Sequence, residues 1–130
     1  METEKGPGRE SEKGPEQDLL ADDDPRGEQL PQPDAADIEL VKVLHALGDP
    51  VRLWLLKVYA DGGQYSCKPG ALGLDHLHKS TVSHHMRTLR ESGVTSTRVV
   101  GRNRYVRLRR EDLDARFPGL LDALIKSLPY

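Results

Sequence analysis

Hydrophobic spacing predicts two consecutive core helices at the start of the ordered chain. The apolar residues of the first helix recur at helical spacing: Ile38, Val41, Leu44 and Leu47. The second helix has clear boundary signals, because Asp49-Pro50 supplies an N-cap residue followed by proline at the first helical position, and Gly62-Gly63 ends the segment. Its apolar face is broad enough for a central core helix.

A narrower apolar stripe runs through residues 79–94, KSTVSHHMRTLRESGV. Three apolar residues lie at positions i, i+4 and i+7: Val82, Met86 and Leu89. Hydroxyl, imidazole and arginine side chains fill most of the other positions, and we expect both His84 and His85 on the outer surface. The pattern predicts a helix from about Ser80 to Ser92 that Gly93 terminates. Pro69 and Gly70 allow only a short helix before it, around Gly70–Leu74.

Two runs suited to strands, VTSTRVV and RYVRLR, follow this helix and are separated by GRN. They predict a β-hairpin with a basic tip at Arg102, Asn103 and Arg104. The last segment, REDLDARFPGLLDALIKSL, predicts a short helical turn, a break and a final helix. Because this is the element order of a winged helix-turn-helix, we predict an α+β, mainly helical domain with a two-stranded β-hairpin wing.

The first 35 residues have the composition of a disordered acidic tail. Residues 1–37 contain twelve Asp or Glu against four Lys or Arg, with few apolar side chains. Such a segment cannot bury enough surface to offset the entropy lost on ordering. We therefore predict a tail over residues 1–35 and one domain over residues 36–130. A further hypothesis is that the tail competes with DNA phosphates for basic residues, in which case deleting residues 1–34 would tighten DNA binding.

Positive charge is concentrated in one part of the predicted domain. The net charge of the chain is −2, yet residues 79–110 hold nine Lys or Arg and a single acidic residue, Glu91. This basic block favours a polyanionic partner, and a merely solvated charged surface is the alternative.

The first turns of the helix predicted over residues 80–92 have the chemistry that a DNA groove requires. Short hydroxyl side chains let the backbone come close, the helix dipole attracts phosphate, imidazoles reach base edges and arginines reach flanking phosphates. The predicted partner is double-stranded DNA, and the predicted DNA-binding residues are Lys79, Ser80, Thr81, Ser83, His84, Arg87, Arg102 and Arg104. The simpler alternative makes Ser80 an N-cap and Ser83 an ordinary exposed residue.

Three segments, LGDPVRLWLL, KSTVSHHMRTLRESGV and TRVVGRNRYVRLRREDL, resemble the ArsR/SmtB family of bacterial winged-helix repressors. The resemblance covers roughly residues 36–127 and excludes the acidic tail. It implies a homodimer, formed by the first and last helices, that binds a palindromic operator and blocks transcription. It also implies that Lys79, Ser80, Ser83 and His84 face the major groove, that Arg87 contacts phosphate, and that Arg102 and Arg104 serve the wing.

Apolar residues on the first and last helices exceed what one small core is expected to absorb, which favours a dimer interface. A dimer also places two recognition helices about one DNA turn apart. The predicted interface residues are Val41, Leu44, Leu120, Leu121, Leu124 and Leu128. A purely intrachain core is the alternative.

The sequence predicts no metal site and no cofactor. Members of the family that sense metals use a Cys-x-Cys pair or a set that includes histidines on the last helix, whereas this chain has one cysteine, Cys67, and no histidine in its last segment. A site improvised from Cys67, His76 and His78, or oxidation of Cys67 between molecules, are alternatives. The existence and identity of an inducer stay open.

Other classes of protein fit the sequence poorly. One cysteine gives no intramolecular disulfide, no apolar run is long enough to cross a membrane, and the N-terminus lacks a secretory pattern, so we predict a cytoplasmic protein. Ser83, His84 and His85 point around one helix and form no catalytic relay, so we predict no enzyme activity. The prediction is a sequence-specific dimeric transcriptional repressor, and the alternative is a winged-helix protein–protein interaction module without specific DNA binding.

Overall fold

The structure is a computed structural model that describes residues 27–130. Residues 1–26, which make up most of the predicted acidic tail, lie outside the described residues. The described fold begins ahead of the boundary predicted at residue 36. The strand β1 (Glu28–Gln29) pairs with a later strand, and the 3-10 helix η1 (Ala35–Asp37) follows it.

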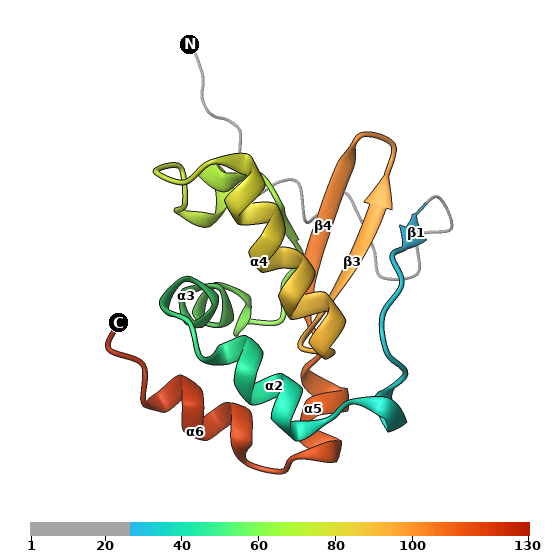
Figure 1. The fold of residues 1–130 in the computed structure, drawn as a ribbon, viewed down its shortest axis with the longest axis vertical. Helices are drawn as coiled ribbons and strands as arrows, with labels where there is room; N and C mark the ends of the chain where they lie inside the picture. Colours follow the sequence, from blue (N-terminus) through green and yellow to red (C-terminus); the bar gives the residue numbers. More distant parts are fainter. Residues whose placement is uncertain (1–26) are drawn as a thin grey trace.

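The remaining elements are helices and short strands. In chain order they are α2 (Leu40–Leu47), α3 (Pro50–Tyr59), β2 (Tyr65–Ser66), η2 (Pro69–Leu72), α4 (Lys79–Ser92), β3 (Thr95–Val100), β4 (Asn103–Leu108), α5 (Arg110–Arg116) and α6 (Leu120–Lys126). The strands form one antiparallel sheet in the order β1-β3-β4-β2. The β3–β4 hairpin extends beside α4, as Figure 1 shows. This α+β arrangement is consistent with a winged helix.

Local signals in the sequence set the boundaries of the two longest helices. The Asp49 side chain accepts hydrogen bonds from the backbone N–H groups of Val51 (2.9 Å) and Arg52 (3.1 Å), which confirms the predicted N-cap of α3. The end of α4 at Gly93 is also confirmed. Gly93 adopts a left-handed conformation with φ of 90°, and the N–H of Val94 donates to the carbonyl of Leu89 at 3.0 Å.

The short helix predicted around Gly70–Leu74 is a single 3-10 turn, η2. The turn ends at Gly73, whose φ of 72° is left-handed. The indole N–H of Trp54 donates to the carbonyl of Leu72 at 2.8 Å, which ties this turn to α3. A proline and two glycines in this segment leave too little helix-forming sequence for a longer element.

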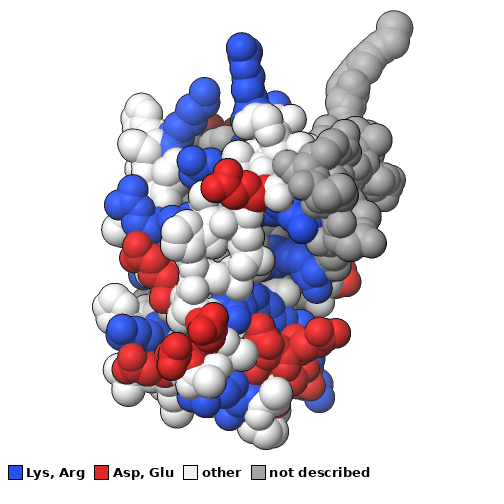
Figure 2. Space-filling model, turned by 90° about the vertical axis from the view of Figure 1, so that its right-hand side faces the viewer, with Lys and Arg blue, Asp and Glu red and all other residues white. Residues whose placement is uncertain are grey.

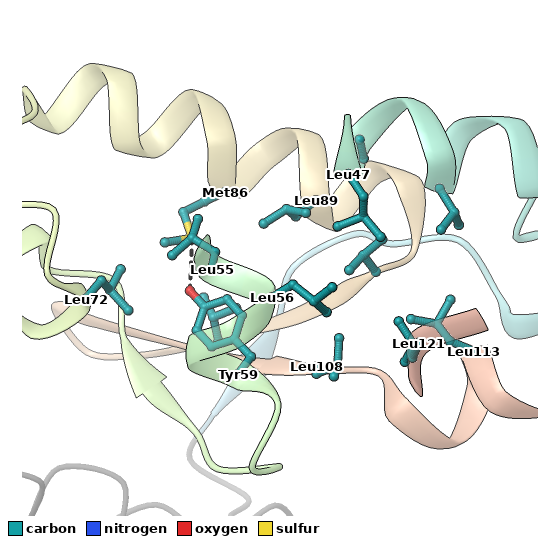
Figure 3. Close-up of a cluster of buried hydrophobic side chains, with 14 of the residues drawn as sticks. Leu47, Leu55, Leu56, Tyr59, Leu72, Met86, Leu89, Leu108, Leu113 and Leu121 are labelled. Carbon is teal, nitrogen blue, oxygen red and sulfur yellow. Dashed lines mark hydrogen bonds between the residues drawn. The ribbon is translucent and has the colours of Figure 1, made fainter. Parts of the chain in front are cut away.

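The core lies between α3, α4 and the sheet, and Figure 3 shows its central side chains. Leu55, Leu56 and Tyr59 of α3 are fully buried in the same cluster as Met86 and Leu89 of α4. The Tyr59 hydroxyl donates to the Met86 sulfur at 3.4 Å. Burial of Val82, Met86 and Leu89 confirms the predicted stripe. The opposite side of α4 is therefore left facing outward.

The residues predicted for a dimer interface fall into three groups by exposure. Val41 and Leu44 on α2 are 76% and 46% exposed, and Leu40 beside them is 43% exposed. Leu120, Leu124 and Leu128 are half-buried. Leu121 is a correction, because its side chain is 0% exposed within the core of its own chain and has no surface left for a partner. It packs inward because α6 folds back against α5.

Candidate nucleic-acid interface

The N-terminus of α4 and the tip of the β3–β4 hairpin lie at the same end of the molecule (Figure 1). A cavity of about 180 Å³ separates them, and both elements contribute to its lining. The polar residues that line it include Lys68, Lys79, Ser83, Arg102, Asn103 and Arg104. Four of these six carry positive charge, so two parts of the chain that the sequence separates by about twenty residues form one basic surface.

All eight residues predicted to bind DNA are exposed in the structure: Lys79, Ser80, Thr81, Ser83, His84, Arg87, Arg102 and Arg104. Figure 2 shows Lys and Arg side chains projecting from the upper end of the molecule, whereas most of the Asp and Glu on this face gather in its lower half. Exposed cations and hydroxyls at one end give that end the chemistry to contact a phosphate backbone.

The first turn of α4 has no side-chain cap. The N-cap position is His78, in an extended conformation and without a side-chain hydrogen bond to the helix. Ser80 lies inside the helix, so the alternative that made it the N-cap is wrong. The positive end of the helix dipole therefore faces solvent beside Lys79, without a carboxylate in the first turn.

Two arginines at the end of the basic block, Arg109 and Arg110, have surroundings different from those of the cavity residues. Arg109 is buried, and its guanidinium donates to Asp112 at 3.0 Å and to the carbonyl of Pro33 at 2.7 Å. Arg110 forms ion pairs with Asp114 at 2.9 Å and with Asp122. These two arginines hold α5 and the N-terminal segment in place. Their positive charge is already matched by carboxylates, unlike the charges around the cavity.

His85 is buried, which corrects its expected place on the outer surface of the helix. It is 9% exposed, and its Nδ1 lies 2.9 Å from the guanidinium of Arg52. Arg52 also donates to the carbonyl of Ala46, so one buried arginine links α2, α3 and α4. Burial lowers the pKa of His85, and Arg52 and His84 lower it further, against the raising effect of Asp49. The signal was present in the sequence, since residue 85 lies three after Val82 and four before Leu89.

Cys67 lines the basic cavity and is half-buried. Burial raises the pKa of its thiol to about 11, although Arg104 and Arg90 act in the opposite direction. The thiol is therefore protonated near neutral pH and is a weak nucleophile. Across residues 27–130, no group of three or more His, Cys, Asp or Glu side chains is placed to hold a metal ion.

The helices of the described chain are too short or too polar to cross a membrane. Helix-turn-helix order, an exposed polar helix N-terminus and a basic hairpin beside it are together the features of a helix-turn-helix DNA-binding protein.

Comparison with known proteins agrees with this class. The chain matches no protein-family model. It is 38% identical over 85 residues, covering 64% of this chain and 83% of the relative, to the uncharacterized HTH-type transcriptional regulator YceK of Bacillus subtilis (strain 168). It is 36% identical over 63 residues, covering 46% of this chain and 66% of the relative, to the uncharacterized HTH-type transcriptional regulator MJ1325 of Methanocaldococcus jannaschii. The chain belongs to the family of HTH-type transcriptional regulators.

Proposed function

We propose that this protein is a dimeric repressor of the ArsR/SmtB type that binds a palindromic operator, with α4 in the major groove and the β3–β4 hairpin as its wing. The observation that carries the proposal is the basic cavity that α4 and the hairpin tip line together. A protein surface that follows the DNA backbone from one groove to the next needs cations on both elements.

Each predicted residue has a role in this arrangement. The small side chains of Ser80, Thr81 and Ser83 let the first turn of α4 approach base edges, and His84 supplies a ring that can read them. Arg87, one turn further along α4, is placed for a flanking phosphate. Lys79, Arg102 and Arg104 add the phosphate contacts around the cavity.

The dimer is supported by the apolar surface of α2. Leu40, Val41 and Leu44 are large apolar side chains with at least 43% of their surface exposed, and they lie next to one another on one helix. Exposed apolar patches of this kind mark protein interfaces. A two-fold related copy covering α2 and α6 would bury them and would match the two-fold symmetry of a palindromic site.

The test is fluorescence anisotropy of the full chain titrated onto duplex DNA from upstream of its own gene, with a random duplex alongside, at two salt concentrations. We expect tight binding with two chains per site. His84→Ala and Arg87→Ala should each weaken binding by about tenfold. Lys57→Ala, an exposed position on α3 outside both proposed surfaces, is the matched control and should bind as the wild type does.

The outcomes separate three functions. Equal, salt-sensitive binding to both duplexes would indicate a protein that coats DNA without selecting a sequence. No binding to either duplex would overturn the proposal and favour a protein–protein interaction module. Specific binding with one chain per site would overturn the proposed dimer and leave sequence-specific DNA binding standing.

A further inference from the structure

The sheet has an outer face that points away from the core. Strand register pairs Ser96 with Arg107 and Arg98 with Tyr105, so these four side chains share one face. Their neighbours in the strands, such as Val106 and Leu108, are buried in the core on the opposite face. We call Ser96, Arg98, Tyr105 and Arg107 the outer sheet face.

The outer sheet face combines positive charge with a buried aromatic ring. Arg98 and Arg107 supply two guanidinium groups, and Tyr105 is only 7% exposed although the core lies on the other side of the sheet. A hollow of about 60 Å³ lies here, lined by Gln29, Gln64, Ser96, Arg98, Tyr105 and Arg107. Such a face fits a chain segment that carries both carboxylates and apolar side chains.

The direction of β1 brings the N-terminal part of the chain to this face. Glu28 pairs with Val99 and Gln29 with Arg98, in antiparallel register, so β1 runs from the hairpin tip towards its base. Gly27, the first described residue, therefore lies at the end of β1 that is nearer the hairpin tip. The side chain of Arg98 lies against the Gly27 backbone, since a Cβ there would be 2.4 Å from the Arg98 Cδ.

The sequence before this entry point is complementary to the outer sheet face. Residues 16–24, EQDLLADDD, contain five carboxylates and the apolar pair Leu19-Leu20, and residues 14–25 contain no Lys or Arg. We call residues 16–24 the acidic segment. Ten extended residues reach roughly 33 Å, whereas a four-stranded sheet is about 15 Å wide. The segment is long enough to cross the sheet from its entry point beside Arg98.

We propose that the acidic segment docks on the outer sheet face of its own chain and acts as an anionic competitor that weakens DNA binding. Its carboxylates pair with Arg98 and Arg107, and its leucines pack along the aliphatic stems of these partly buried arginines. Docking then brings five carboxylates to a face that has only two arginines, and the remaining negative charge repels approaching phosphates. The docking does not depend on the proposed function, but the effect on DNA does.

Docking is tested without DNA, by the heteronuclear NOE of the backbone amides of residues 16–24 in the full chain. We expect values typical of ordered backbone in the wild type and a marked drop in the double variant R98Q/R107Q. The matched control K79Q/R87Q removes the same charge from the α4 surface and should keep the wild-type values. The triple variant D22N/D23N/D24N changes the other partner and should also lose order, which guards against a folding defect in R98Q/R107Q.

Two results would overturn docking on this face. One is a low NOE throughout the segment in the wild type. The other is loss of order in K79Q/R87Q with R98Q/R107Q unchanged, which would place the segment on the α4 surface.

Competition is tested by anisotropy with a random duplex at low salt. We expect D22N/D23N/D24N to bind about threefold or more tightly than the wild type, with the gain fading at high salt. E2Q/E4Q/E10Q removes three charges further from the entry point and should give a smaller gain. In an R98Q/R107Q background the gain from D22N/D23N/D24N should disappear. Deleting residues 1–34 is a less clean test, because it also removes β1 and the Pro33–Arg109 hydrogen bond.

The outcomes distinguish this inference from the proposed function. If no variant binds DNA, the proposed function fails while the NOE result still decides docking. If the segment is ordered but D22N/D23N/D24N and wild type bind DNA equally, the competitor role is overturned.

Discussion

The two ends of α4 differ in how the rest of the chain holds them. At the C-terminal end, Gly93 donates to the carbonyl of Arg90 at 3.1 Å, Val94 donates to that of Leu89 at 3.0 Å, and Ile38 packs against the glycine. At the N-terminal end, no side chain caps the helix and its first residues are exposed. The C-terminal end of α4 is fixed by contacts within the chain, whereas the N-terminal end offers the backbone N–H groups of its first turn to a partner. Substitutions at the two ends should therefore affect different properties.

The largest expected effect is on stability, at the fixed end. Gly93→Ala puts a Cβ at a φ of 90° and only 2.7 Å from the Cγ1 of Ile38. The left-handed conformation and the overpacking together should lower the free energy of unfolding by about 3 kcal/mol. Chemical denaturation followed by circular dichroism measures this change.

Gly62→Ala is the matched control for that substitution. Gly62 also has a left-handed φ, of 84°, but nothing lies within 4 Å of the place that a Cβ would take, so only the backbone cost of about 1–2 kcal/mol applies. Equal losses for the two variants would show that the close approach of Ile38 adds nothing to the cost at Gly93.

The next largest effect concerns a third surface, the apolar face of α2. Val41→Glu places a charge at a position that is 76% exposed in one chain and that our proposal buries in a dimer. The dimer dissociation constant should rise at least about tenfold while the fold stays intact. Sedimentation velocity over a concentration series measures it. Ala115→Glu, at an exposed position of α5, should leave the association unchanged, and a wild-type chain that is monomeric throughout would refute the dimer.

The start of α3 and the end of α4 were more predictable from the sequence than the long-range contacts of the fold. Asp49-Pro50 and Gly93 define helix boundaries through contacts within a few residues, so the sequence alone was sufficient there. The contact of Arg109 with the Pro33 carbonyl is harder to predict from the sequence, because Pro33 lies 76 residues away in the chain. The pairing of β1 with β3 is similar, since a two-residue strand carries no periodic signal of its own.

A smaller effect should follow from removing one charge at the hairpin tip. Arg102 is exposed and lines the cavity beside α4, so Arg102→Gln should weaken DNA binding a few-fold. The slope of the logarithm of the binding constant against the logarithm of salt concentration should become shallower by about 1. Anisotropy titrations at four salt concentrations give that slope. Stability should be unchanged, in contrast to Gly93→Ala. An unchanged slope would remove Arg102 from the phosphate contacts.

The smallest effect concerns two adjacent histidines between the ends of α4, which differ in burial. His84 is exposed, whereas His85 is buried against Arg52 at 2.9 Å. The Arg52 guanidinium can only donate, so His85 must accept through a neutral ring. Burial, Arg52 and His84 lower the pKa of His85 from its ordinary value of 6.5, against the opposing charge of Asp49.

The sign of the resulting pH dependence follows from proton linkage. Below pH 6.5 the unfolded chain binds a proton at residue 85 more readily than the folded chain, so the free energy of unfolding falls as the pH falls. The loss continues until the pH passes the lowered pKa of the folded state and then levels off. One histidine contributes at most one proton to this slope.

His85→Asn keeps an acceptor for Arg52 but cannot titrate, so it should flatten the stability profile just below pH 6.5. His76→Asn, which removes an exposed histidine from the loop before α4, should retain the wild-type slope. Denaturation midpoints measured between pH 5 and pH 8 compare the three chains, a range that spans the ordinary histidine pKa of about 6.5. If the slope survives in His85→Asn, the buried contact between α3 and α4 is not what makes the fold sensitive to acid, and another group must bind the proton.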